Sequence, residues 1–265
     1  MKNQKITLLS IVVFIVFMSC SKGKDDHAAV KGKGDDCSDV HWSHHPGEDG
    51  PENWAGLCSG FSDCGGTAQS PIDINVAEVK ADQQLAAPEF SYGSSQVAIV
   101  NNGHTVQFNV SGDHSVVLDG KTYRLLQFHY HAASEHTIDG KQYPLEVHFV
   151  HKHSDDDFAV LGVFFEEGDE YPLFTNYLDS FPKSEGEHKS SDLIELADLF
   201  PANKSYYNYK GSLTTPPCSE VVNWYVLHTP VTASAQQLKR FAEILDNNFR
   251  PVLPLNGRTV RSFTE

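Results

Sequence analysis

Over much of the chain, hydrophobic and polar residues alternate in the short runs that are typical of β-strands. Three such runs lie between positions 96 and 118, and Gly and Asn-Gly turns separate them, which predicts a β-meander. Two further strands, 127–131 and 145–150, flank the turn dipeptide Asp139-Gly140 and predict a hairpin. Residues 158–165 are apolar at every position but a glycine, which indicates a central strand buried on both faces.

Helical patterns are few and lie in the second half of the chain. Residues 171–181 and 192–200 are predicted to be partly helical, and Pro201 ends the second segment. Residues 233–249 predict an amphipathic helix whose apolar face is formed by Leu238, Phe241, Ile244 and Leu245. We therefore expect one α/β domain dominated by a large, mainly antiparallel twisted sheet with short peripheral helices.

The first nineteen residues predict a leader peptide. Lys2 and Lys5 precede an apolar run, 6–18, that is too short to span a bilayer and fits a secretory signal. Residues 17–20, Phe-Met-Ser-Cys, resemble a lipobox, although Phe17 stands where Leu, Val or Ile is usual. This pattern favours Cys20 as the lipidated first residue of the mature protein; the alternative is an ordinary signal peptide cut nearby, with Cys20 a stray thiol.

Residues 20–36 consist mainly of Lys, Gly and Asp and predict a flexible tether to a domain that spans residues 37–265. The formal charge is −15, and removing the two leader lysines makes it about −17. A surface this acidic argues against binding nucleic acid or anionic lipid headgroups. We therefore expect an exported protein of the bacterial cell envelope that contacts the membrane only through its lipid anchor; the sequence leaves its oligomeric state open.

A cluster of histidines predicts a metal site. His129 and His131 share one face of their strand, and His148 on the return strand can face them across the ladder. Three imidazoles on two rigid strands make a zinc site with an open fourth position. An H-x-H pair arises easily by chance in a chain with 14 histidines. Gln127 and Glu146, each two residues before a histidine, are placed to fix the rings and favour the metal site.

The segments that carry these histidines, F-H-Y-H, S-E-H-T and L-E-V-H-F-V-H, resemble those of the α-class carbonic anhydrases. The resemblance extends from about His41 to Phe263. It implies a sheet of about ten strands, a Zn²⁺ cofactor, and the reversible hydration of carbon dioxide to bicarbonate and a proton through zinc-bound hydroxide.

The resemblance also implies roles for other residues. The N-N-G-H segment would make His104 the proton shuttle, and Gln107 would be a polar residue of the pocket. In S-L-T-T-P-P, Thr214 would accept a hydrogen bond from the hydroxide and donate one to the buried carboxylate of Glu135. The carbon dioxide pocket would be lined by Val150, Val160, Leu213, Thr215 and Trp224.

Beyond Cys20 the chain has four cysteines: Cys37, Cys58, Cys64 and Cys218. An oxidising compartment favours disulfides, but the count alone allows three pairings. The resemblance implies a bridge from Cys64 to Cys218, which leaves Cys37 with Cys58.

One departure from the family lies near its H-W segment, where a tyrosine is usual and His44 stands here, followed by His45. We expect both side chains to be exposed, with assistance in proton transfer as the alternative. His151 and His153 are not included among the ligands, since His151 faces away from His148 on a regular strand.

Two other classes of protein remain as alternatives. A catalytically silent relative would usually lack one of the three zinc histidines, and all three are present. A zinc-scavenging lipoprotein would need neither Thr214 nor Glu135, and both are present.

Overall fold

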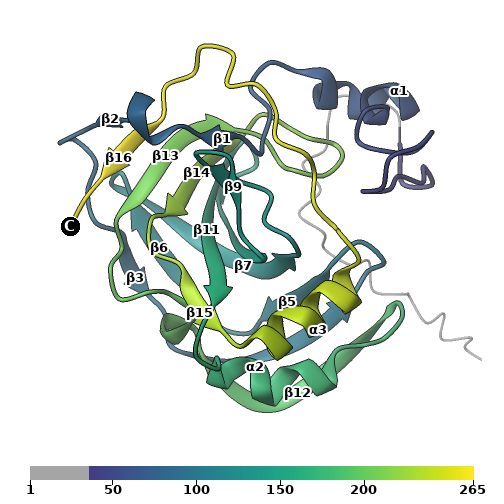
Figure 1. The fold of residues 1–265 in the computed structure, drawn as a ribbon, viewed down its shortest axis with the longest axis vertical. Helices are drawn as coiled ribbons and strands as arrows, with labels where there is room; N and C mark the ends of the chain where they lie inside the picture. Colours follow the sequence, from purple (N-terminus) through teal and green to yellow (C-terminus); the bar gives the residue numbers. More distant parts are fainter. Residues whose placement is uncertain (1–35) are drawn as a thin grey trace, which may run out of the picture.

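The computed structural model describes residues 36–265, and strands are its main regular structure (Figure 1). The predicted leader peptide, Cys20 and nearly all of the predicted tether lie outside the described residues. The strands are β1 (Asp73–Ile74), β2 (Lys80–Ala81), β3 (Glu89–Ser91), β4 (Ser94–Asn101), β5 (Val106–Val110), β6 (Ser115–Leu118), β7 (Lys121–His131), β8 (Thr137–Ile138), β9 (Lys141–Gln142), β10 (Leu145–Ser154), β11 (Asp157–Glu167), β12 (Gly186–Glu195), β13 (Tyr206–Gly211), β14 (Val222–Leu227), β15 (Val231–Ala233) and β16 (Arg261–Phe263).

One large twisted sheet organises the described residues. Its main path runs β12-β4-β5-β7-β10-β11-β14-β13-β16-β2, and β3, β6 and β15 join it at the side. Most neighbouring strands are antiparallel, while β11 pairs in parallel with both β14 and β15. The expected β-dominated α/β fold and the strand count of about ten along the path are therefore confirmed. Strands β1, β8 and β9 form a separate small sheet.

The centre of the sheet is apolar on both faces, as the residues of β11 show. Leu161, Val163 and Phe165 point into one hydrophobic cluster, and Val160 and Phe164 point into a second cluster on the other face. Period-2 alternation separates the two sets. The continuous apolar run predicted a strand of this kind because neither face meets water.

Within residues 36–265, three α-helices lie at the periphery: α1 (Trp54–Leu57), α2 (Pro172–Tyr177) and α3 (Ala235–Leu245). The rings of Phe174 on α2 and Phe241 on α3 are 4.5 Å apart, and Figure 1 shows these helices side by side. The prediction of a helix over 233–249 was too long at both ends. Ala233 pairs in β15, and α3 begins after Ser234, whose side chain forms a capping box with Gln237. The left-handed Asp246, with φ of 45°, ends the helix.

The segment 192–200 differs from its prediction. Residues up to Glu195 belong to β12, which pairs with β4 at the edge of the sheet, and only the 3-10 turn Leu196–Leu199 is helical. Pairing with β4 provides hydrogen-bond partners for the backbone N–H and C=O groups of these residues, and this outweighs their helical sequence pattern. The first predicted segment, 171–181, is α2 followed by the 3-10 turn Leu178–Ser180.

Two disulfides tie down the amino-terminal part. Cys64 bonds to Cys218, with their Cα atoms 4.9 Å apart, and Cys37 bonds to Cys58 at 6.1 Å. Disulfides are typical of proteins that leave the reducing cytosol. Among the residues that the structure describes, no helix is both long and apolar enough to cross a membrane.

Candidate metal centre

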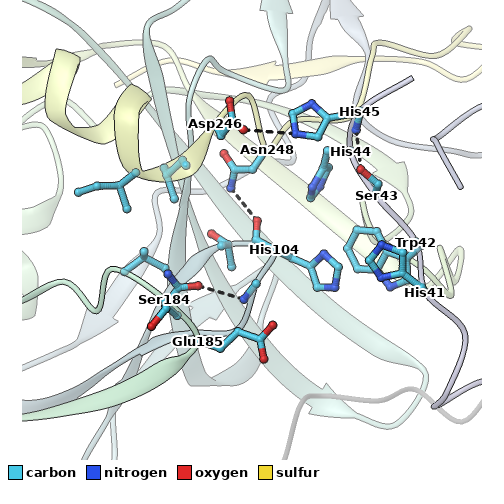
Figure 2. A pocket seen from close by; sticks show the side chains of 16 residues that line it. His41, Trp42, Ser43, His44, His45, His104, Ser184, Glu185, Asp246 and Asn248 are labelled. Carbon is cyan, nitrogen blue, oxygen red and sulfur yellow. Dashed lines mark hydrogen bonds and ion pairs between the residues drawn. The ribbon is translucent and has the colours of Figure 1, made fainter. Parts of the chain in front are cut away.

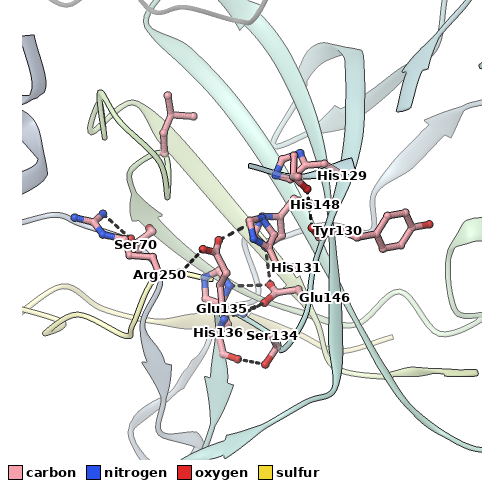
Figure 3. A network of polar contacts seen from close by, with 12 residues as sticks. Ser70, His129, Tyr130, His131, Ser134, Glu135, His136, Glu146, His148 and Arg250 are labelled. Atoms are coloured by element: carbon pink, nitrogen blue, oxygen red, sulfur yellow. Dashed lines mark hydrogen bonds and ion pairs between the residues drawn. The ribbon is translucent and has the colours of Figure 1, made fainter. Parts of the chain in front are cut away.

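Strands β7 and β10 bring the three predicted histidines together. The antiparallel register sets His148 directly opposite His129, and it sets Glu146 opposite His131. The three ring centroids lie between 4.6 and 5.4 Å apart, and one nitrogen of each ring lies within 4.8 Å of the others (Figure 3). These donor atoms are close enough to share one metal ion.

Each ring has an oxygen beside its other nitrogen. Gln127 Oε1 accepts from His129 Nδ1 at 2.9 Å, and the backbone oxygen of Asn248 accepts from His131 Nδ1 at 2.7 Å. Carbonyl oxygens can only accept, so each Nδ1 carries the proton and each Nε2 presents a lone pair. The Nε2 atom of His148 lies 2.9 Å from Glu146 Oε1, which leaves its Nδ1 for the shared space. Such partners fix the orientation of metal ligands.

Glu146 supports the site through a buried network. Its Oε2 atom accepts from the backbone N–H groups of Glu135 and His136, both at 2.9 Å, and its Oε1 lies 2.8 Å from His136 Nδ1. His136 Nε2 in turn contacts the hydroxyl of Tyr209 at 2.6 Å. Glu146, His136 and His148 are themselves close enough to hold a metal, but they use their polar atoms on one another.

The electrostatics of the three histidines suit a cation. Burial lowers the pKa of His129 well below its usual value and also lowers that of His131, so both rings are kept in the neutral, ligating form. Burial would also lower the pKa of His148, but the negative charge of Glu146 outweighs it and raises that pKa. The Glu146 carboxylate therefore brings negative charge to the edge of the site.

Glu135 is buried beside the histidines. Its Oε2 atom lies 3.5 Å from His131 Nε2 and 3.7 Å from His148 Nδ1. Within the described residues, neither His131 Nε2 nor Glu135 Oε2 has a hydrogen-bond partner. Buried polar atoms without partners are costly, so this cluster fits a bound metal and its polar ligand.

The predicted hydrogen bond between Thr214 and Glu135 is not present among residues 36–265. Glu135 Oε1 instead accepts from the backbone N–H of Arg250 at 2.8 Å. The Arg250 guanidinium donates to Gln69 Oε1 at 2.8 Å and to the backbone oxygens of Ser70 and Cys64. Thr214 is buried and lines the cavity above the histidines.

A cavity of about 450 Å³ opens over the three rings, and it has two kinds of wall. One wall is apolar: Val150 pairs with Val160, which pairs with Trp224 on the next strand, and Leu213 and Thr215 continue it. The opposite wall is polar and includes Gln107, Asn109 and Gln127. All five predicted pocket residues line this cavity, so it can receive a small apolar substrate beside a charged centre.

His104 lies farther out, near the mouth (Figure 2). Its ring stacks on Trp42, with the centroids 3.7 Å apart and the planes within 7°. The Asn248 side chain donates to its backbone oxygen at 3.1 Å. Figure 2 shows both rings facing a second cavity of about 360 Å³, which the predicted shuttle borders together with the main one.

The prediction that His44 is exposed was wrong. The edges of Trp42 and Trp54 cover its ring at centroid distances of 5.2 and 5.9 Å, and the side chain is half-buried. Burial and the neighbouring His131 lower the pKa of His44 to about 3. His45 is exposed, as expected, and lies 3.6 Å from a carboxylate oxygen of Asp246.

The other two histidines that were left out of the ligand set lie elsewhere. His151 is buried on the opposite face of the sheet, where its Nε2 contacts the hydroxyl of Tyr92. His153 contacts the backbone oxygen of Thr122.

Several supporting residues were not anticipated from the sequence. Asn248 and Arg250 were not predicted to support the site, and neither were His136 and Tyr209. The partners of Asn248 and Arg250 lie more than 100 residues away, and such contacts leave no periodic trace in the sequence.

Three histidines on two strands, at the floor of a cavity with one apolar wall, define a class of proteins: metal-dependent enzymes that act on small molecules. Residues 49–264 match the family model described as eukaryotic-type carbonic anhydrase, and the chain belongs to this family. It is an enzyme of the carbonic anhydrase type, as the resemblance implied.

Its relatives include a carbonic anhydrase of Pectobacterium atrosepticum, 42% identical over 224 residues that cover 83% of this chain and 90% of the relative. A carbonic anhydrase of Nostoc is 39% identical and covers 83% and 85% of the two chains. Among solved structures, the α-carbonic anhydrase of Thermovibrio ammonificans in complex with the inhibitor sulfanilamide has a TM-score of 0.80 at 44% identity, covering 84% and 99%.

Proposed function

We propose that this protein is a zinc enzyme that hydrates carbon dioxide reversibly to bicarbonate and a proton. The observation that carries the proposal is the convergence of three imidazoles, two buried and one half-buried, each with one nitrogen near a common point and the other beside an oxygen. Membership of the carbonic anhydrase family supports the reaction.

His129, His131 and His148 would hold the zinc ion, with Gln127 and Glu146 fixing two of the rings. Three neutral nitrogen donors with room for a fourth ligand are typical of catalytic rather than structural zinc. Zinc bound in this way lowers the pKa of water from 15.7 to about 7 and so supplies hydroxide at neutral pH.

The apolar wall would hold carbon dioxide next to that nucleophile. Val150, Val160 and Trp224 offer no hydrogen bonds toward the cavity, since the Trp224 N–H is used by the backbone oxygen of Ser212 at 3.0 Å. A surface of this kind accepts an uncharged molecule more readily than its charged product. The apolar wall therefore favours carbon dioxide, and the polar wall favours bicarbonate and the released proton.

Thr214 and Glu135 would orient the nucleophile. Glu135 Oε2 has no hydrogen-bond partner in residues 36–265, and a Thr214 hydroxyl that donated to it would have only its lone pairs to offer toward the metal. The fourth position on the metal would therefore favour a ligand, such as hydroxide, that can donate a hydrogen bond to Thr214. His104 would carry the released proton to buffer, because an imidazole can accept a proton on one nitrogen and donate one from the other, and this ring borders both cavities.

We propose that the protein is exported, anchored in the bacterial cell envelope through lipid on Cys20, and tethered by residues 20–36. The two disulfides and the predicted leader support this setting. Its acidic surface disfavours nucleic acid as a partner.

Stopped-flow hydration of carbon dioxide by residues 37–265 tests the proposed reaction. Fast hydration should disappear when a chelator removes the metal and should return with zinc alone. Tight zinc binding without hydration would support a zinc-scavenging protein instead. Hydration that survives complete removal of the metal would overturn the zinc assignment.

A further inference from the structure

The loop that carries His44 is closed by the Cys37–Cys58 disulfide and folded on itself. The Trp54 indole N–H donates to the backbone oxygens of Ser43 and Asp49, both at 3.1 Å. The Ser43 N–H donates to the Asp49 oxygen at 2.9 Å. These contacts fix the backbone on either side of His44, so its ring is held in one place and not left to sample solvent.

His44 borders both cavities, the one over the metal ligands and the outer one. Its ring centroid lies 6.4 Å from that of His131 and 6.3 Å from that of His104. Figure 2 shows its ring above the stacked rings of Trp42 and His104, on the same wall as His45. His44 therefore lies next to both a predicted metal ligand and the predicted proton shuttle.

The Nε2 atom of His44 is buried, and it has no hydrogen-bond partner in residues 36–265. A buried nitrogen without a hydrogen-bond partner is destabilising, whereas a phenyl ring would fill the space between Trp42 and Trp54 without that penalty. Packing alone therefore does not account for an imidazole here. The cavities on which it borders are polar on this side and wide enough for water.

We propose that His44 is a positioning residue of the proton path, and that its Nε2 hydrogen-bonds a water molecule linking the metal cavity to His104. An imidazole in its neutral form offers one N–H donor and one acceptor, so a ring held at this place can fix the direction of hydrogen bonds in a chain of water. The inference rests on the proposed function, since it concerns the proton that hydration releases.

The His44→Phe variant keeps the ring and removes both nitrogens, and His44→Gln keeps a polar nitrogen near the place of Nε2. In the zinc-loaded enzyme at low buffer, we expect Phe to lower kcat about threefold to tenfold, as for the loss of one hydrogen bond. kcat/KM for carbon dioxide should stay within about twofold, because the proton leaves after hydration. Gln should recover most of kcat, and concentrated imidazole buffer should remove the difference. The matched control is His45→Ala, which should behave like the wild type.

A readout independent of activity is a high-resolution crystal structure. It should contain an ordered water within about 3.2 Å of His44 Nε2, and the His44→Phe structure should lack it. A kcat unchanged in His44→Phe, an equal fall in kcat and kcat/KM, or a dry Nε2 would each overturn the inference. If the wild type binds zinc but does not hydrate carbon dioxide, the proposed function fails. The crystal structures would still show whether a water molecule binds His44 Nε2.

Discussion

The backbone oxygen of Asn248 accepts a hydrogen bond from Nδ1 of His131 at 2.7 Å, although 117 positions separate the two residues. The Asn248 side chain also accepts from the Ala132 N–H at 3.0 Å, and it donates to the backbone oxygens of Tyr130 and His104. One buried residue thus joins the end of the ligand strand to the loop that carries the predicted proton shuttle.

Replacing Asn248 with alanine should therefore affect both the metal site and stability. Three side-chain hydrogen bonds would be lost, at about 1 kcal/mol each, and unfolding in urea should show a loss of about 3 kcal/mol. The backbone oxygen that accepts from His131 remains in the variant, but the side chain no longer anchors it, so zinc affinity should fall by no more than about tenfold. Competition with a zinc dye would measure that change.

The matched control is Asn247→Gly. Asn247 is exposed and has a left-handed backbone, with φ of 58°, which glycine adopts freely. It should keep wild-type zinc affinity. Equal affinities for Asn248→Ala and the control would show that the Asn248 side chain is not needed to hold the backbone oxygen that orients His131.

Substitution of Gly162 should also weaken the metal site. It lies opposite His148 in the β10–β11 ladder, and a Cβ atom added to it would come within 2.9 Å of Glu146 Oε1. Alanine would therefore push the carboxylate away from His148 and disturb the ring. We expect Gly162→Ala to weaken zinc binding about tenfold to 100-fold, measured by the same competition.

The control for Gly162 is Gly56→Ala in α1, where no atom lies within 4 Å of an added Cβ. It should bind zinc like the wild type and be equally or slightly more stable, because alanine favours a helix. If Gly162→Ala retains wild-type affinity, the close approach of Glu146 is not required for the site.

Variants of Thr214 test whether its hydroxyl orients the nucleophile. Thr214→Ala should lower hydration about 100-fold, the cost of losing one group that orients reacting charge, while the zinc content stays at one equivalent. Thr214→Ser retains the hydroxyl and should keep most of the activity. Hydration unchanged in the alanine variant would exclude the assignment of Thr214 and Glu135.

These sites differ in how far the sequence alone could predict them. The spacing of His129, His131 and His148 predicted a shared site because period-2 alternation and one hairpin decide which side chains face each other. The apolar run in β11 predicted its burial for a similar local reason. Gln127 could be placed beside His129 because the two residues share a strand face.

The contributions that could not be predicted depend on contacts between distant segments. The burial of His44 requires the packing of two tryptophans and a disulfide, and none of these follows from its neighbours in the sequence. The end of α3 was misplaced because Asp246 and Asn247 adopt left-handed backbones that an amphipathic pattern does not reveal. Contacts in the folded structure, rather than local sequence, determine the burial of His44 and the end of α3.

The pair of Tyr92 and His151 should make the fold sensitive to acid. His151 is fully buried; its Nδ1 lies 2.8 Å from the Phe149 oxygen and its Nε2 contacts the Tyr92 hydroxyl, with the buried His114 ring 6.4 Å from Tyr92. Burial lowers the pKa of His151 from 6.5 to about 4. The unfolded chain therefore binds this proton more readily than the folded one. The resulting stability is present in full above pH 6.5 and is lost as the pH falls toward 4.

We expect this one group to remove about 2 kcal/mol of the free energy of unfolding between pH 7 and pH 5. The double variant Tyr92→Phe/His151→Leu removes the imidazole together with the hydroxyl that contacts it, so it should fold and lack this loss. Urea unfolding of the two metal-free proteins at both pH values measures the difference, and the zinc histidines cancel because both proteins contain them. Tyr92→Phe alone keeps the buried imidazole and should retain the acid sensitivity. An identical pH dependence in the wild type and the double variant would show that His151 is not its source.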